Sequence, residues 1–312
     1  MENLLIPARC TVPIFLMMAV GNILRRTQCF SESFFSQLNR FCFCILLPAR
    51  LFYSIYTADF GKTFFLGVNL FVIAEAVVTF AAAYMLTTAA GMERRHKGAW
   101  LQNFYRSNLA VSGMALIQNL CGEEGMAILG IALTFLGPIY NILAVAGLDV
   151  CRGEKVRLWG TLKSIFRNPL VLASLSSAVL LALEVRLPAL LTDTIESIGE
   201  CNAPVAIIAL GASLELSTIR TDCKELLAGS AVRLIVVPAI SLLAAIPLGF
   251  RGSELGVILI CAGSPLATTA YTMAQAYDSD EAFTAELVVA TTLLCCITMF
   301  FWILLLSWMN LI

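Results

Sequence analysis

The chain has 312 residues, of which 59% are hydrophobic and 13% are charged, and its formal net charge at pH 7 is −1. A soluble domain carries about 25% charged residues, so a chain this apolar must have the lipid bilayer as its solvent. A net charge near zero supplies no field that would attract nucleic acid, and membrane lipid is the partner that the composition indicates.

The eleven cysteines lie mostly within apolar stretches, as Cys42, Cys261 and Cys295 do. None has CxxC spacing or the spacing of a Cys/His metal motif. We therefore interpret them as small apolar packing residues, and we expect no disulfide framework, no metal and no resident cofactor.

The first apolar stretch is too long for the core of a signal peptide, and its positive charges, Arg25 and Arg26, follow it instead of preceding it. We therefore read it as a membrane span, which needs about 20 apolar residues. The whole chain predicts ten spans, at residues 4–24, 36–56, 63–90, 99–120, 125–148, 168–187, 192–216, 225–249, 254–277 and 282–309.

Lys and Arg are distributed unevenly between the two sets of loops. Only Lys62, Arg186 and Arg251 lie in the loops after the even-numbered spans. Because cytoplasmic loops are enriched in Lys and Arg, we expect a protein of the cell membrane with both termini outside. The residues of the opposite loops are Arg25, Arg26, Arg94, Arg95, Lys97, Arg152, Lys155, Arg157, Lys163, Arg167, Arg220 and Lys224.

Five predicted spans lie on each side of a central linker, which suggests two inverted five-helix repeats, residues 1–148 and 168–312. The linker, residues 149–167, has an apolar face beside basic residues and is expected to lie on the cytoplasmic membrane surface. That face consists of Trp159, Leu162, Ile165 and Phe166.

Consistent offsets between the two halves support this duplication. In spans two and seven, Pro48 pairs with Pro204. In spans four and nine, one common shift pairs Ser107 with Ser264, Gln118 with Gln275, Glu123 with Asp280 and Glu124 with Glu281.

Helix-start signals occur in the middle of two of these spans. Ser264 and Pro265 form an N-cap and first-turn pair within span nine, and Ser107 and Asn108 occupy the equivalent place in span four, followed by Gly113. Interrupted backbone at membrane depth is tolerated where it lines a cavity or is buried by protein. Two half-helix N-termini could hold an anion there without a fixed positive side chain. Simple kinks packed by neighbouring helices are the alternative.

The order and spacing of several motifs make the chain similar to the auxin efflux carrier family, which includes plant PIN auxin exporters and bacterial organic-acid carriers. The chain departs from the family at Arg50, Ala115 and Ala270, and auxin is therefore not assigned as the substrate. The matching stretches are ILLPARLF, RSNLAVSGMAL followed by CGEEG, NPL, PVAIIALGASLEL and AGSPLATTAYTMAQAYDSDEA.

The resemblance implies an all-α fold like that of the NhaA antiporter and the bile acid symporters, with broken helices four and nine crossing at the midplane. Spans two and seven would belong to a scaffold that forms a homodimer. A small-molecule carboxylate would bind at the crossing, where Asn108 and Gly113 match the family. The expected substrate-binding residues are Ser107, Asn108, Ser112, Gly113, Ser264, Pro265, Thr268, Thr269 and Tyr271.

The sequence predicts a specific role or position for each of four further charged or titratable residues. Glu75, within span three, could carry a coupling proton or form a structural hydrogen bond. Arg106 could attract the anion or extend its charge to the membrane interface. We expect Arg233 to snorkel or pair near a span end, and His96 to be a solvated loop residue.

Enzyme functions are disfavoured, because the chain has one histidine and its aspartates fall in loops or at the ends of predicted spans. The leading interpretation is a secondary transporter that moves small carboxylates by alternating access, with a proton or sodium ion as the coupling ion. A sodium-coupled symporter of the bile-acid type and a membrane sensor that binds a ligand without moving it remain alternatives.

Overall fold

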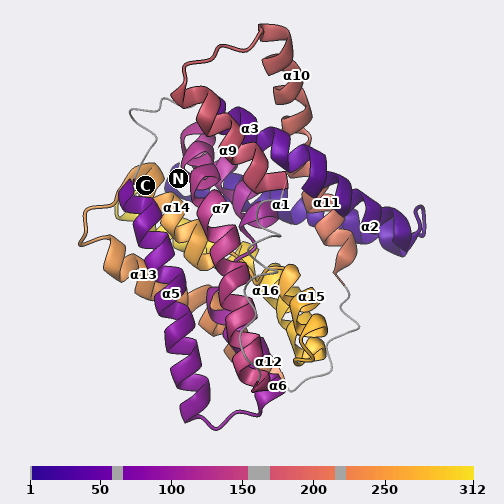
Figure 1. The fold of residues 1–312 in the computed structure, drawn as a ribbon, viewed down its shortest axis with the longest axis vertical. Helices are drawn as coiled ribbons and strands as arrows, with labels where there is room; N and C mark the ends of the chain where they lie inside the picture. Colours follow the sequence, from indigo (N-terminus) through magenta and orange to yellow (C-terminus); the bar gives the residue numbers. More distant parts are fainter. Residues whose placement is uncertain (1, 58–65, 154–168, 215–222) are drawn as a thin grey trace.

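The computed structural model describes residues 2–57, 66–153, 169–214 and 223–312, whose regular secondary structure is helical, with no β-strand among them (Figure 1). Most of the predicted linker, including its apolar face, lies outside the described residues. Helix formation follows from the membrane setting, because a helix satisfies its backbone hydrogen bonds within one segment.

The first two predicted spans form one continuous helix and one helix in three parts. Ser31 caps the second of these, since its side chain accepts a hydrogen bond from the backbone N–H of Phe34. Pro48 stands in the first turn of the last part, where its missing N–H is tolerated. The elements are α1 (Glu2–Arg26), α2 (Glu32–Phe41), the π-helical turn η1 (Cys42–Leu46) and α3 (Leu47–Tyr56).

The next three predicted spans differ most from expectation. No loop separates spans four and five; the helix instead turns sharply at Gly122, whose φ of 60° suits glycine, and continues to Arg152. The elements are α5 (Leu66–Ala89), α6 (Arg94–Tyr105), the π-helical turn η2 (Leu109–Gly113) and α7 (Met114–Arg152).

The second half of the chain consists mainly of shorter helices. The predicted span seven is divided at Cys201, and the predicted span nine is divided after Gly263. The elements are α9 (Pro169–Ala182), α10 (Ala189–Glu200), α11 (Asn202–Ser213), α12 (Cys223–Ala231), the π-helical turn η4 (Val232–Val236), α13 (Val237–Ala245), α14 (Gly252–Gly263), α15 (Thr269–Ala276) and α16 (Glu281–Trp308).

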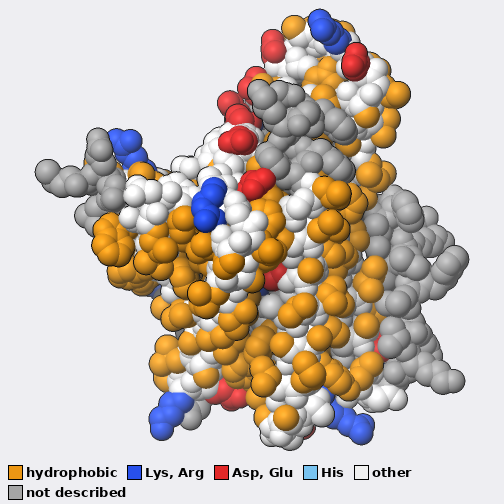
Figure 2. All heavy atoms as spheres, turned by 90° about the vertical axis from the view of Figure 1, so that its left-hand side faces the viewer, with side chains coloured by type: hydrophobic (Ala, Val, Ile, Leu, Met, Phe, Trp, Pro, Cys, Tyr) orange, Lys and Arg blue, Asp and Glu red, His pale blue; other side chains and the backbone are white. Residues whose placement is uncertain are grey.

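Seven helical segments of the described chain are long and apolar enough to cross a membrane, and Pro169–Ala182 and Gly252–Gly263 are shorter apolar helices. The face in Figure 2 has hydrophobic side chains across its middle, with charged side chains gathered toward its upper and lower ends. The molecule is therefore an integral membrane protein. The long segments are Leu5–Arg26, Ser33–Tyr56, Leu66–Ala89, Leu109–Arg152, Ala189–Ser213, Cys223–Ala245 and Glu281–Trp308.

Small residues let α1 approach α11 closely. A side chain at Gly21 would collide with the backbone of Ile208, and one at Gly211 would collide with the backbone of Met18. Such close backbone contact is the usual way in which membrane helices gain packing energy without a hydrophobic driving force. This contact ties the first span to the predicted seventh.

Candidate functional site: a crossing of two interrupted helices

Two helices of the core are interrupted at the positions that the sequence indicates. Helix α6 ends at Tyr105, and Arg106 leaves it in an extended conformation. Helix α14 ends at Gly263, and Ser264 is extended in the same way. Each interruption releases backbone N–H and C=O groups, which must find partners inside the protein.

Backbone groups released at one interruption form hydrogen bonds with those released at the other. Ser107 and Leu266 form an antiparallel bridge between them. The backbone N–H of Asn108 donates to the carbonyl of Pro265 over 2.9 Å, and that of Ala267 donates to the carbonyl of Arg106 over 3.0 Å. The chain therefore crosses itself here through main-chain hydrogen bonds, which fixes one break against the other.

The capping chemistry differs from the prediction. Helix α15 begins at Thr269, so Ser264 ends α14 instead of capping the following half-helix. Asn108 does hold the N-cap position of η2, but its side chain makes no capping bond. Three residues after Ser264 are irregular because they are used in the bridge and its flanking hydrogen bonds, which leaves a helix start only at Thr269.

Two polar side chains at the crossing remain available. Within the described part of the chain, the buried Nδ2 of Asn108 and the buried Oγ of Ser264 have no hydrogen-bond partner. An unpaired buried polar group is costly, so each one in a native structure calls for an explanation, such as a functional role or a bound water or ion. Asn108 offers donors that suit a carboxylate.

Arg233 lies at the crossing, which corrects the expectation that it sits near a span end. It is 1% exposed. Its Nε donates to the carbonyl of Ser264 over 2.8 Å, Nη1 donates to the carbonyl of Phe104 over 2.8 Å, and Nη2 donates to Oγ of Ser107. The cation thus stands beside the C-terminal ends of α6 and α14, where the helix dipoles favour positive charge. The sequence feature that could have placed Arg233 at the crossing is its position well inside an apolar stretch.

Arg106 is also buried, so it does not extend to the membrane interface. Its Nε and Nη2 both donate to Oγ1 of Thr269, and Nη1 donates to the carbonyl of Tyr140 over 3.1 Å. Nη2 also donates to Oδ1 of Asn141 over 2.8 Å. Arg106 therefore joins the start of α15 to α7 and brings a second positive charge to the crossing.

A cavity of about 360 Å³ lies beside the crossing, between the predicted spans two and seven and the start of α15. Of the predicted site residues, Thr268, Thr269 and Tyr271 line it. Ser112 and Gly113 are buried in η2 behind this wall, and a side chain at Gly113 would press on Ile260 of α14. Ser107, Asn108, Ser264 and Pro265 form the crossing itself.

Glu75 lies away from this cavity, on α5. Its carboxylate accepts a hydrogen bond from Oγ of Ser241 on α13 over 3.0 Å. Arg233 is near enough for the two opposite charges to attract each other. Glu75 is thus linked to the crossing through Arg233, and not through a substrate contact.

His96 is not a solvated loop residue, as the sequence led us to expect. It lies on α6, partly buried, with Nδ1 2.9 Å from Oδ2 of Asp280 and Nε2 2.6 Å from Oε1 of Glu225. Burial lowers the pKa of His96, but hydrogen bonds to the two carboxylates outweigh burial, so the pKa is raised above its ordinary value of 6.5. The histidine fastens α6 to the starts of α12 and α16.

Fixed positive charge lies beside the two helix breaks that the sequence predicts. Two buried guanidinium groups flank the crossing, with one unpartnered amide between the interrupted helices. In a low-dielectric interior such charges act strongly on a nearby anion. The geometry therefore defines an integral membrane protein with a candidate site inside its helical core.

Comparison with known proteins agrees with this class. The chain belongs to the family described as membrane transport protein, whose pattern matches residues 9–146 and 156–303. It is similar to the uncharacterized transporter YfdV of Escherichia coli strain K12, with 24% identity over 86% of this chain and 87% of the relative. It is also similar to an uncharacterized transporter of Methanothermobacter thermautotrophicus, with 22% identity over 93% and 95% of the two chains. The protein is therefore a membrane transporter and not an enzyme.

Proposed function

We propose that the protein is a secondary active carrier of small organic anions, chiefly carboxylates, that works by alternating access. The observation that carries this proposal is the crossing, where Asn108 offers an unpartnered buried amide near Arg106 and Arg233. A carboxylate is the ligand that amide N–H groups and a positive field would stabilise together. The adjoining cavity supplies room for it.

The proposal includes ten spans arranged as two inverted repeats, with both termini outside a cell membrane. Ser107 and Ser264, which the internal sequence match pairs, both lie in interruptions, and this supports the repeat. Ile6 and Ile312 line one cavity, which supports termini on the same side. The excess of Lys and Arg in the opposite loops supports their outward orientation.

Coupling and assembly are further parts of the proposal. Glu75 is the candidate carrier of a coupling proton, since it is a carboxylate at membrane depth. The positive charge of Arg233 attracts it electrostatically. Sodium coupling is the alternative that the bile-acid symporters suggest. A homodimer through the predicted spans two and seven rests on the resemblance to the auxin efflux carriers.

Flux in proteoliposomes tests the proposal. The purified chain should move a small carboxylate such as propionate against a counter-gradient, and a proton or sodium gradient should drive the flux. Asn108→Ala should weaken binding roughly 10- to 150-fold, because a hydrogen bond to a charged group is lost. Asn119→Ala is the matched control, since the Asn119 amide already donates to the carbonyl of Cys10 over 3.1 Å.

The outcomes separate the alternatives. Flux that requires sodium and does not depend on pH would favour a symporter of the bile-acid type. Binding without flux of any carboxylate would favour a sensor and would overturn the carrier. Wild-type affinity in Asn108→Ala would remove the crossing as the binding site, whatever the flux.

A further inference from the structure

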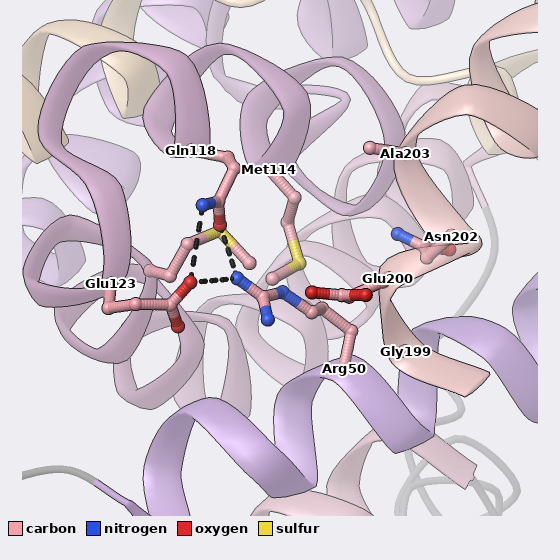
Figure 3. A pocket seen from close by; sticks show the side chains of 9 residues that line it. Arg50, Met114, Gln118, Glu123, Gly199, Glu200, Asn202 and Ala203 are labelled. Carbon is pink, nitrogen blue, oxygen red and sulfur yellow. Dashed lines mark hydrogen bonds and ion pairs between the residues drawn. The ribbon is translucent and has the colours of Figure 1, made fainter. Parts of the chain in front are cut away.

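A second cavity, of about 270 Å³, lies between α3, α7 and the junction of α10 and α11. Its polar lining comes from Arg50, Gln118, Glu123, Glu200 and Asn202 (Figure 3). At about 30 Å³ for each water molecule, the cavity has room for roughly nine waters, and therefore for an organic molecule of a few heavy atoms. The charges around this cavity indicate what kind of molecule it would take.

Arg50 is 7% exposed and uses only one of its terminal nitrogens. Nη2 donates to Oε1 of Gln118 and to Oε1 of Glu123, the latter over 2.5 Å. In the described part of the chain, Nε and Nη1 of this guanidinium have no hydrogen-bond partner. They lie on different sides of the guanidinium, so each can donate a single charge-assisted hydrogen bond to an anion.

Asn202 is the second buried group without a partner. It is 3% exposed, and no hydrogen bond to its amide is found among the described residues. It lines both this cavity and the cavity beside the crossing. A molecule bound at Arg50 would therefore lie next to the same side chain as a molecule at the crossing, with Asn202 able to offer a donor or an acceptor to either.

The charge balance of the lining argues against a simple anion. Arg50 contributes one positive charge, whereas Glu123 and Glu200 contribute two negative charges. Glu123 is engaged by Arg50, but Glu200, at the end of α10, has no ion pair within the described residues. In Figure 3 the Glu200 carboxylate lies toward the cavity, between the Arg50 side chain and Asn202. A ligand that carried only a carboxylate would leave this negative charge unbalanced.

We propose that this cavity is a binding site for a small zwitterion, whose carboxylate accepts a hydrogen bond from a free N–H group of Arg50 and whose ammonium group pairs with Glu200. The proposal rests on the proposed function, since it names amino-substituted carboxylates as the substrate class admitted to the crossing. Asn202 would contact the ligand from the side that leads to the crossing. On the predicted orientation this cavity opens toward the outside.

Three probes of nearly equal size separate the contributions of the two charges. L-Alanine carries both groups, propionate lacks the amine, and ethylamine lacks the carboxylate. Titration of the purified full-length chain should show that L-alanine binds roughly tenfold more tightly than either fragment, since each fragment leaves one charged partner unmatched. Equal affinities for L-alanine and propionate, or no binding of L-alanine, would overturn the zwitterion site.

Variants test each side of the site. Arg50→Gln should weaken L-alanine binding roughly 10- to 100-fold through loss of a charged hydrogen bond. Glu200→Gln, an exposed position that leaves the fold undisturbed, should weaken L-alanine about threefold or more and leave propionate unchanged or tighter. Arg186→Gln, an exposed arginine outside the cavity, is the matched control and should bind L-alanine as the wild type does. An equal loss for both ligands in Glu200→Gln would contradict the assignment.

The experiments can distinguish failure of the zwitterion-site proposal from failure of the proposal that the protein is a carrier. Propionate flux that depends on Asn108, together with no preference for L-alanine, would overturn the zwitterion site and keep the carrier. Binding of L-alanine that depends on Arg50 and Glu200, together with no flux of L-alanine or propionate, would keep the site and overturn the carrier.

Discussion

Arg233 donates from Nε to the carbonyl of Ser264 over 2.8 Å, which places a positive charge at the end of α14. The same guanidinium reaches the carbonyl of Phe104, near the end of α6. One side chain from a third element therefore closes the C-terminal ends of both interrupted helices. This explains how two breaks can persist in the apolar interior: the main-chain bridge pairs some of the released groups, and side chains, Arg233 among them, pair others.

Arg233→Met should destabilise the fold strongly, because it leaves buried carbonyls without a donor. Each such group costs roughly 1–3 kcal/mol, so we expect a loss on the order of 3 kcal/mol or more in the free energy of unfolding. Thermal or denaturant unfolding in detergent would measure it. Arg251→Met is the matched control, because Arg251 also donates to backbone carbonyls but is exposed, so water replaces it. A comparable loss in both variants would show that Arg233 has no special role.

Thr269→Val should reduce substrate binding without unfolding the protein. The Thr269 hydroxyl accepts two hydrogen bonds from Arg106 at the wall of the cavity beside the crossing, and valine has the same shape without the acceptor. We expect roughly tenfold weaker binding, with recovery in Thr269→Ser. Thr272→Val is the control, since Thr272 lines the same cavity but bonds the carbonyl of Thr269 in its own helix. Equal effects at the two threonines would contradict this role for Arg106.

Glu75→Gln should change how transport depends on pH. A carboxylate at membrane depth can exchange a proton with each transport cycle, and the amide that replaces it cannot. Glu75 is also linked to the crossing through the charge of Arg233, so the state of one affects the other. Initial rates in proteoliposomes from about pH 5 to about pH 8 would measure the change. An unaltered pH profile would assign Glu75 the structural role that its bond to Ser241 suggests.

Local chain chemistry accounts for what the sequence predicted well. Pro265 lacks a backbone N–H, and the serines beside both breaks favour helix ends, so the interruptions could be located before any packing was known. The apolar stretches likewise identified most of the long helices. The sharp turn of the helix at Gly122 was not predicted, because a glycine within a charged segment is typical of a loop.

Tertiary contacts account for what the sequence missed. The number of residues from a span end says nothing about what packs around Arg233, and only the fold brings Ser107, Phe104 and Ser264 to it. His96 stands in a run of charged residues, which is typical of a solvated loop. Its two carboxylate partners lie more than one hundred residues away, on α12 and at the start of α16. Pairings of that kind have no local signature.

Reporter fusions test the proposed topology. The unequal distribution of Lys and Arg predicts that the segment around Gly160 faces the cytoplasm and that the C-terminus faces outward. Fusions of the same reporter at these two points should therefore report opposite sides of the membrane. Fusion at the N-terminus should agree with the C-terminal one. A cytoplasmic C-terminus would contradict the ten-span arrangement and with it the two inverted repeats.

His96 should make the stability of the protein depend on pH near neutrality. Both ring nitrogens face carboxylates, and only the protonated ring donates to Asp280 and Glu225 together. The pKa of His96 is therefore higher in the folded protein than in the unfolded chain. The stabilisation is fully present below the unfolded value and is lost as the pH rises through the folded one.

The midpoint of thermal unfolding should consequently fall as the pH is raised from about 6 to about 8.5. The chain has a single histidine, so His96→Gln tests the assignment directly and should flatten the slope. Arg95→Gln is the control, because Arg95 pairs with Asp278 next to the same cluster in an exposed position. It should lower stability slightly at every pH and keep the slope. A slope that survives in His96→Gln would show that another group is responsible, and that the bonds to Asp280 and Glu225 hold the helices together without a change of protonation.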